Sequence, residues 1–526
     1  MAYIQPNSTI MILRYVPLEP DYEHTLYTSD RSVQQSAFSS FVKYTLSANT
    51  YQRVNKNSCR VGIVADNLYD CNYMMFQNTN FGTKWFYAFI TGVEYINNEC
   101  TEITYEIDVM QTYFHNFVFG HCFVEREHSE TDALFENYVP ESINYGDIVY
   151  DNGLTSLFSG NKINIYILAV NHQNPYHNVG AIVENTFSGG NLYAWTIDGS
   201  SSSLSAAQSS IQAFLNNYEN VPENILGIWA GPALATDYSS NHVVPQGAHI
   251  YSSYNTTGIA GNESFGGGFV PKNKKLYCYP YNFYYVTNGN SGVNYHYEYF
   301  KDAGGGHNPN FTILASMMPT PECILSPTGY KGCDTFSIGA LGESLSIKGW
   351  GVGSWTNDTW AQLVRNRAID FGADLSNPLG LISPIGYAGV VTGGIHSIGR
   401  AIAKEDFVPK TTYGSAHSGC ALASDGKLTF YGGRARITTE YAKIIDDYFS
   451  VYGYQTNRIK VPNTHSRPRW NYVKTGTCEL VANETMPADD AQKIKDCMNK
   501  GITFWKSLND VGMYNLDNRP VVSNNT

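Results

Sequence analysis

Charged residues are scarce in this 526-residue chain, of which Asp, Glu, Lys and Arg make up only 15%. Acidic residues outnumber basic ones, and the formal net charge is −12. Proteins that grip nucleic acid through its phosphates need clustered Lys and Arg, so this balance argues against such a role. The same balance is compatible with a protein past which DNA slides, because an acidic wall repels the phosphates and does not retain the DNA. Simple solubility explains the same charge equally well.

Cysteine is also rare: ten residues are scattered along the chain, and no two form a C-x-x-C pair. This pattern argues against a zinc cluster and against a disulfide scaffold. We therefore expect reduced thiols made in a cytosol. The N-terminus lacks a basic region followed by an apolar run, so we expect no secretory signal.

Enzyme signatures are missing as well. The sequence contains no G-x-S-x-G, H-E-x-x-H or G-x-x-x-x-G-K-[ST] motif, and its 13 histidines show no ligand spacing. Glu125, Glu127 and His128 lie close together, and strand alternation would put the two carboxylates on one face and the imidazole on the other. We interpret them as a surface charge cluster and expect no enzyme, cofactor or metal. Paired carboxylates for glycan hydrolysis stay an alternative, because their proximity is spatial.

One chargeless stretch, Leu375–Gly399, stands out among the features that are present. Its 25 residues could cross a hydrocarbon layer, yet six glycines and two prolines oppose a continuous helix. Such a segment must be hidden from water, either as a buried glycine-rich connection or by meeting lipid in a second state. Beyond Leu375 at its start, its large aliphatic side chains are Leu379, Leu381, Ile382, Ile385, Val390, Val391, Ile395 and Ile398.

The composition favours a mainly β fold with some α-helix, divided into several domains. Aromatic residues reach 14%, and strand-forming runs lie between turn residues. The expected strands are 10–16, 40–46, 59–64, 84–95, 102–109, 162–170, 275–286, 295–300, 311–315 and 336–349. Helices are expected at about 204–217, 357–370, 438–451 and 487–499, and a Gly-rich loop at 258–268. In the third helix, Tyr441, Ile444, Ile445 and Tyr448 follow helical spacing, and Gly453 can end it.

Charge is distributed unevenly along the chain. Residues 1–130 hold eight basic and 14 acidic residues, whereas residues 431–480 hold eight basic and four acidic ones. The second region could be a nucleic-acid patch, with Trp470 and Tyr472 between its cations. We prefer a strand pair that packs beside the acidic N-terminal sheet, within or between subunits, since repetition of such a contact about an axis closes a ring. The main cations are Arg458, Lys460, Arg467, Arg469 and Lys474.

Several blocks carry a resemblance to a known family. They are YMMFQNTNFGTKWFYAFI (Tyr73–Ile90), YEIDVMQTYF (Tyr105–Phe114), FVEREH (Phe123–His128), KLYCYPY (Lys275–Tyr281), YGYQTNRIKVPN (Tyr452–Asn463), RWNYVKT (Arg469–Thr475) and GITFWK (Gly501–Lys506). With these blocks, in this order, the chain resembles the tail-knob, or distal tail tube, proteins of small short-tailed bacteriophages that infect Gram-positive bacteria.

The resemblance implies a homohexameric tube at the tail tip, with DNA leaving the virion through its lumen. It implies a β-barrel-like tube domain made from residues 1–130 and 411–526, and an apolar loop at 371–410 that plugs the lumen and penetrates the host membrane. Residues 131–270 and 271–370 would be an inserted α+β domain and an inserted β-rich domain. The segment Leu375–Gly399 sits at the position of the family's plug.

The implied partners follow from that role. They are five further copies of the chain, an upstream tail or collar protein, tail-tip or appendage proteins, genomic DNA passing without specific contacts, and transiently the host membrane. The protein would belong to the virion tail and assemble in the host cytoplasm. One alternative is a receptor- or cell-wall-glycan-binding tail protein, which the aromatic run YCYPYNFYY (Tyr277–Tyr285) motivates. A cell-wall hydrolase is a third.

Overall fold

The computed structural model describes most of both chain ends and parts of the middle. The described residues are 8–49, 57–78, 82–157, 163–170, 190–197, 206, 209–210, 225–232, 242–244, 249–287, 291–301, 306–316, 322–332, 345–348, 350–354 and 430–520. The helix expected at 357–370 and the apolar segment lie outside them, as does most of the helix expected at 204–217.

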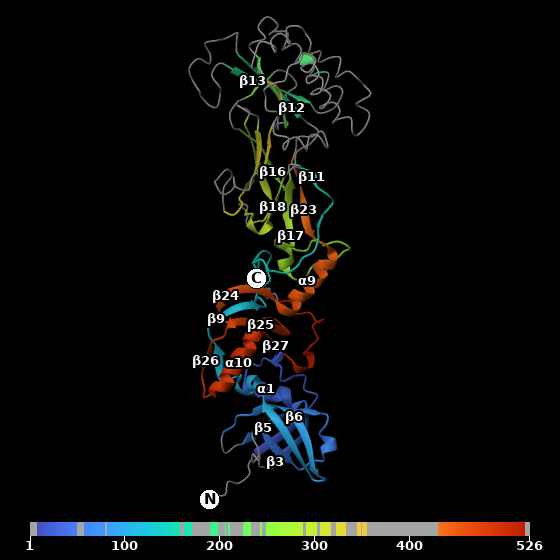
Figure 1. The fold of residues 1–526 in the computed structure, drawn as a ribbon, viewed down its shortest axis with the longest axis vertical. Helices are drawn as coiled ribbons and strands as arrows, with labels where there is room; N and C mark the ends of the chain where they lie inside the picture. Colours follow the sequence, from blue (N-terminus) through green and yellow to red (C-terminus); the bar gives the residue numbers. More distant parts are fainter. Residues whose placement is uncertain are drawn as a thin grey trace, which may run out of the picture. The chain divides into compact units, whose positions relative to one another are not determined.

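The chain folds into two compact units, and each combines segments that are distant in sequence. The first unit contains residues 1–145, 264–276 and 439–526, and the second contains 146–263 and 277–438. In Figure 1 the blue N-terminal strands and the orange and red C-terminal elements lie together in the first unit. Strands dominate both units, so the predicted mainly β, multi-domain class is confirmed.

A six-stranded antiparallel sheet forms the N-terminal part of the first unit, in the order β3-β1-β5-β6-β7-β4. Its strands are β1 (Ser8–Arg14), β3 (Val42–Asn49), β4 (Ser58–Val61), β5 (Cys71–Asn78), β6 (Phe86–Asn97) and β7 (Cys100–Ile107). Along β7, Ile103 and Tyr105 are buried between less buried neighbours, which is the alternation of a half-buried strand.

A five-stranded sheet joins the two ends of the chain, in the order β2-β27-β25-β9-β24. Its strands are β2 (His24–Leu26), β9 (Cys122–Glu127), β24 (Tyr454–Lys460), β25 (Trp470–Thr477) and β27 (Ile502–Trp505). Only β2 and β27 pair in parallel among them. A short antiparallel pair, β8 (Phe117–Phe119) with β26 (Leu480–Ala482), adds a second link between early and late residues.

One hydrophobic core connects the two sheets with the helices. Its buried side chains come from the six-stranded sheet, from β25 and β27, and from the helices α1 (Arg31–Ser39), α2 (Val109–Tyr113) and α10 (Ala488–Lys500). Helix α1 was not predicted. Its local signal is Asp30, whose carboxylate accepts the N–H groups of Ser32 and Val33 as an N-cap.

The C-terminal helices were predicted to within one residue, as α9 (Thr439–Tyr452) and α10. Gly453 and Gly501 follow them with φ of 64° and 103°. The expected apolar face of α9 is confirmed at Ile445 but wrong at Tyr441 and Ile444, which are exposed while Asp446 is buried. The physical reason is polar: Asp446 accepts the backbone N–H of Asn273 at 2.9 Å, which turns this face of the helix inward.

The described residues of the second unit form three antiparallel sheets. The first has β10 (Ile148–Tyr150), β23 (Tyr431–Ile437), β17 (Asn282–Thr287) and β18 (Gly292–Tyr295), with β11 (Thr155–Ser156) beside β23. The second has β15 (His242–Val244), β13 (Gly190–Ile197), β12 (Ile163–Val170), β14 (Ile225–Pro232) and β22 (Trp350–Ser354). The third has β16 (His249–Asn255), β19 (Asn310–Ser316), β20 (Glu322–Thr328) and β21 (Leu345–Lys348).

Two strand predictions in this unit need correction. The run 275–286 begins with the 3-10 turn η4 (Lys274–Tyr277), and only its end is strand β17. The run 295–300 holds the 3-10 turn η5 (Tyr297–Tyr299) instead of a strand. Tyr295, Tyr297 and Phe300 are all buried, so the run lacks the two-residue alternation of a half-buried strand. The strand expected at 162–170 and the loop at 258–268 are confirmed.

Candidate functional site in the charged part of the first unit

The aliphatic residues predicted to form a plug lie outside the described part of the chain. They are Leu379, Leu381, Ile382, Ile385, Val390, Val391, Ile395 and Ile398. Their role stays a prediction. Within the described residues, no helix combines the length and the apolar character that a membrane crossing needs.

The basic C-terminal strands lie on both sides of the acid-bearing strand β9. Lys460 on β24 places its Nζ 2.5 Å from Glu127 Oε1, and Lys474 on β25 places its Nζ 2.8 Å from Glu125 Oε2. For Lys460 and Lys474, packing beside acidic residues of 1–130 is confirmed within one chain, but their partners lie on β9 of the five-stranded sheet and not on the six-stranded N-terminal sheet. The strands are not a pair, however, because β9 lies between them.

The surface interpretation of the β9 cluster holds for Glu125 and is wrong for Glu127 and His128. Glu127 is only 1% exposed and His128 only 3% exposed. Strict alternation fails because the pairing of β9 shifts register against both β24 and β25. These irregularities turn the end of β9 toward the interior.

His128 has a structural role. Its Nδ1 accepts the backbone N–H of Tyr472 at 2.8 Å, and its Nε2 lies 3.2 Å from the carbonyl oxygen of Ser450. Since Nδ1 accepts a proton donor, the ring proton belongs on Nε2. Burial lowers the pKa of His128 to about 3, so the imidazole is neutral and both nitrogens are engaged.

The buried carboxylate of Glu141 connects three other segments of the first unit. Glu141 pairs with Arg126 and with Lys275, whose Nζ lies 2.5 Å from Glu141 Oε1. The same Oε1 accepts the backbone N–H of Gln455 at 3.0 Å. Sequence inspection missed this group, because nothing local to any one of these residues indicates the other three.

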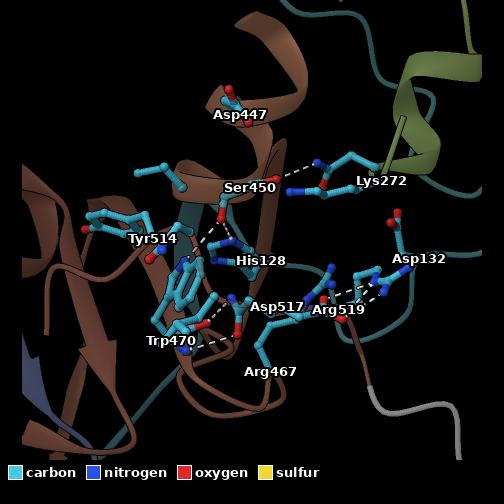
Figure 2. Close-up of a pocket in the computed structure, with 15 residues that line it drawn as sticks. His128, Asp132, Lys272, Asp447, Ser450, Arg467, Trp470, Tyr514, Asp517 and Arg519 are labelled. Carbon is cyan, nitrogen blue, oxygen red and sulfur yellow. Dashed lines mark hydrogen bonds and ion pairs between the residues drawn. The ribbon is translucent and has the colours of Figure 1, made fainter. Parts of the chain in front are cut away.

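A cavity of about 580 Å³ opens beside these strands and α9 (Figure 2). Charged side chains of both signs line it, together with the aromatic rings of Trp470 and Tyr514. The charged lining residues are Asp132, Lys272, Asp447, Arg467, Asp517 and Arg519. Of these only Arg467 was singled out from the sequence, as part of the basic cluster.

The last described segment of the chain forms one wall of this cavity. Asn518 holds it in place: its Oδ1 accepts the backbone N–H groups of Arg469 and Trp470, and its Nδ2 donates to the Trp470 carbonyl at 2.9 Å. Beside it, Arg519 pairs with Asp517 at 2.7 Å. The backbone hydrogen-bonding groups at the start of β25 are therefore paired by a side chain from the C-terminal segment.

The deeper charges of the cavity interact with one another. Arg467 is 4% exposed and its Nε donates to the Ser129 carbonyl at 2.9 Å. Burial lowers the pKa of Arg467, and nearby Asp132 opposes this shift. Burial raises the pKa of Asp132, although Tyr454 donates its hydroxyl to that carboxylate at 2.7 Å.

The arrangement suits recognition of a polar group better than catalysis. In the described lining no nucleophile is hydrogen-bonded to a free base, since His128 is fully engaged. Across the described chain, no cluster of three His, Cys, Asp or Glu residues could hold a metal ion.

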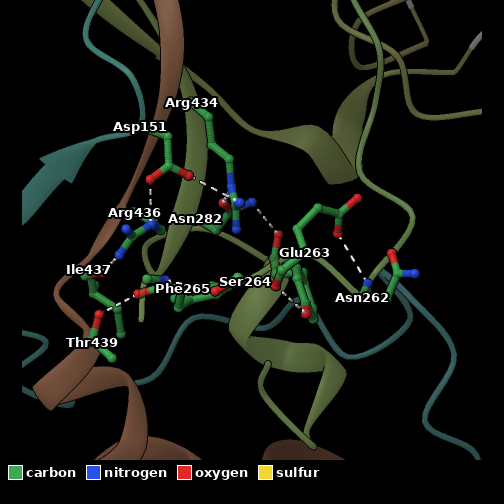
Figure 3. A network of polar contacts seen from close by, with 12 residues as sticks. Asp151, Asn262, Glu263, Ser264, Phe265, Asn282, Arg434, Arg436, Ile437 and Thr439 are labelled. Atoms are coloured by element: carbon green, nitrogen blue, oxygen red, sulfur yellow. Dashed lines mark hydrogen bonds and ion pairs between the residues drawn. The ribbon is translucent and has the colours of Figure 1, made fainter. Parts of the chain in front are cut away.

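A second polar network lies on β23 and β17 in the second unit (Figure 3). Asp151 forms ion pairs with two arginines: its Oδ1 lies 2.6 Å from Arg436 Nε and its Oδ2 lies 3.1 Å from Arg434 Nη1. The Nε of Arg434 also donates to Asn282 Oδ1 at 2.7 Å. The alternating arginines of β23 thus hold the strand to the turn that follows β10 and to β17. The sequence analysis did not identify this group.

The aromatic run Tyr277–Tyr285 is not an exposed platform for sugars. Tyr277 and Tyr281 are fully buried, and Phe283 and Tyr284 are no more than 6% exposed. Their rings pack in the interior of the second unit. The observation that motivated a glycan-binding function is therefore explained by core packing.

Comparisons with known proteins agree along nearly the whole chain. Residues 246–519 match the family described as the C-terminal domain of the tail knob protein gp9 of Bacillus phage phi29. Residues 6–118 match the family described as the N-terminus of caudoviral major tail proteins.

Individual relatives give the same picture. Tail knob protein gp9 of Bacillus phage PZA is 25% identical, over 98% of this chain and 100% of the relative. The corresponding protein of Bacillus phage B103 is also 25% identical with the same coverage. Among solved structures, the tail knob protein gp12 of bacteriophage C1 aligns with a TM-score of 0.61 over 98% of this chain and 100% of that one, at 13% identity. At this identity the likeness concerns the fold.

Proposed function

Because the chain belongs to the bacteriophage tail knob family, whose members are structural components of the virion tail, we propose that it forms a homohexameric tube through which DNA is ejected. In this proposal the apolar segment Leu375–Gly399 plugs the lumen and penetrates the host membrane. The observation that carries the proposal is the match to tail knob proteins over 98% of the chain.

The construction of the first unit supports a tube wall. Both ends of the chain contribute to it, and β2 and β27 join them directly in one sheet. A wall built this way takes only residues 264–276 from the middle of the chain, which leaves residues 146–263 and 277–438 to form a separate unit. Ring closure would need a heterologous contact repeated six times.

The chemistry of Leu375–Gly399 supports a segment with two sheltered states. Burial of apolar surface gains about 25 cal/mol per Å², whether the shelter is five symmetry mates or a lipid layer. In lipid the backbone groups must still be paired, which requires short helices or pairing between copies. The glycines and prolines of the segment favour broken, short elements over one straight span.

The proposed partners follow from a position at the tail tip. They are an upstream tail or collar protein, tail-tip or appendage proteins, the genomic DNA during its passage, and briefly the host membrane. The net charge of −12 supports passage without retention, since an acidic wall repels the phosphates. Assembly in the host cytoplasm would precede release.

Light scattering after size-exclusion chromatography tests the ring. We expect a mass close to six times 58.5 kDa, and a negative-stain image along the axis should show a central hole. A protein that stays monomeric at high concentration would argue against the tube.

Dye release from liposomes tests the membrane step separately. Wild-type protein and a variant lacking residues 375–399 are added to dye-loaded vesicles at the same concentration. Leakage from the wild type alone is expected. Equal leakage from both proteins would remove the membrane role from this segment while leaving the tube proposal intact.

A further inference from the structure

Two cysteines from distant parts of the chain meet where the neighbouring strands β9 and β25 of the five-stranded sheet begin and end. Cys122 begins β9, and Cys478 directly follows β25. Their Sγ atoms lie 4.0 Å apart. The register explains the contact, because Thr477 pairs with Phe123 and the next residue on each strand is one of these cysteines.

The surroundings keep both side chains in this position. The backbone N–H of Glu479 donates to Cys122 Sγ at 3.2 Å, and the Gly120 N–H donates to the Glu479 carbonyl at 2.9 Å. Cys122 is fully buried, whereas Cys478 is half-buried. Cys478 is thus the less buried of the two, and we expect a small reagent to react with it first.

We propose that Cys122 and Cys478 form a disulfide after the virion leaves the host cell. Both are free thiols here, and side-chain rotations need only bring their Sγ atoms from 4.0 Å to the S–S bond length of about 2 Å. Thiols made in a reducing cytosol meet oxidising surroundings once a virion is released. The inference rests on tail location alone and not on the proposed ring or membrane step.

The reaction takes place by exchange with a small external disulfide. The Cys478 thiolate attacks one sulfur of the reagent, which forms a mixed disulfide and releases one small thiolate. The Cys122 thiolate then attacks Cys478 Sγ and releases the second. Two protein thiols are oxidised, one reagent disulfide is reduced to two thiols, and the two protons go to solvent or to the leaving thiolates.

The rate should depend on pH, because thiolate is the attacking form. Burial raises the pKa of the Cys478 thiol above its ordinary value, so only a small fraction is ionised near neutrality. Each rise of one pH unit should speed the exchange about tenfold. The product would join residues 356 positions apart and fasten β9 to the connection between β25 and β26.

Peptide mapping of the full-length protein under non-reducing conditions tests the proposal, with oxidised glutathione as the reagent. We expect a linked peptide pair containing Cys122 and Cys478, a mass lower by about 2 Da for the two lost hydrogens, and a higher melting temperature that dithiothreitol reverses. Cys478→Ala and Cys122→Ala should abolish all three changes.

Cys497→Ser provides the matched control, since Cys497 is also half-buried but lies on α10. It should form the linked pair as readily as wild type. Folded wild-type protein that gains no linked pair at pH 8 after prolonged exposure would overturn the proposal, as would linkage through other cysteines. Mapping of purified virions repeats the test in the assembled tail.

Discussion

Buried carboxylates connect separate segments of the first unit at the scale of single residues. Asp108, Glu127, Glu141 and Asp446 are at most 6% exposed. Each accepts a backbone N–H, from Gln111, Asn463, Gln455 and Asn273 respectively. Three of these donors lie more than 170 positions away from the acceptor. A charge-poor chain thus uses several of its acidic residues inside the fold, where each bond fixes a long-range contact.

Asp108 makes stability depend on pH. It caps α2 through the Gln111 N–H at 3.0 Å and accepts the Tyr73 hydroxyl at 2.8 Å, yet burial raises its pKa to about 6. The folded state therefore holds this proton more tightly than the unfolded chain. Its contribution to stability is complete below about pH 4 and is lost as the pH rises through about 6, an effect on the order of 3 kcal/mol.

Asp108→Asn should remove that pH dependence while keeping an acceptor for the Gln111 N–H. Urea unfolding at pH 4 and pH 7 measures it: the variant should gain stability relative to wild type at the higher pH. Tyr73→Phe is the companion variant. It removes a bond that favours the ionised carboxylate, so it should steepen the decline. Parallel curves for wild type and Asp108→Asn would contradict the assignment.

The two lysines beside β9 should differ in importance. Lys460 neutralises Glu127, which is buried, whereas Lys474 pairs with Glu125 at a site where both side chains are more than a third exposed. Lys460→Met should lower the free energy of unfolding by about 2 kcal/mol, because a buried carboxylate loses its partner. Lys474→Met should change it by less than about 1 kcal/mol. Equal losses in chemical denaturation would show that burial does not separate these pairs.

Secondary-structure elements show which local patterns were informative. Strand β7 and helix α10 were predictable, because alternation and end signals act within a few residues. Helix α1 was missed because only Gln34 and Phe38 are buried on it, so its apolar pattern is weak. The inward turn of β9 and the orientation of α9 could not be predicted. Both are set by partners more than 170 residues away, namely the flanking strands for β9 and Asn273 for α9.

The junction between α9 and β24 depends on one glycine. Gly453 has a φ of 64°, and a Cβ there would lie 2.3 Å from the carbonyl oxygen of Glu127. Gly453→Ala should therefore cost about 3 kcal/mol or more, because backbone atoms of β9 must move. Gly512→Ala is the control: its φ is 82° but nothing lies within 4 Å, so only the local strain of about 1 kcal/mol applies. Thermal unfolding of both variants measures the difference.

At the scale of the whole molecule, each compact unit is built from segments that are distant in sequence. Composition and strand patterns predicted a mainly β, multi-domain chain, and the resemblance predicted a domain built from both ends. Residues 131–145 and 264–276 also belong to the first unit, which no local sequence pattern indicates. The buried ion pair between Glu141 and Lys275 connects these two segments, and it forms only in the folded chain. The eight aliphatic residues of the plug remain a prediction from sequence.

The last prediction concerns that segment in the assembled particle. Val390→Asp with Val391→Asp should leave the proposed hexamer intact, because its proposed wall is formed by the ends of the chain. Infectivity should fall by at least tenfold, since unpaired charge is disfavoured both in a dry plug and in lipid. Val390→Ser with Val391→Ser is the neutral comparison and should lose less. Plaque assays and light scattering on the same preparations separate the two effects: a variant that no longer assembles would mean that these valines belong to the wall, and full infectivity would mean that the segment never has to stay dry.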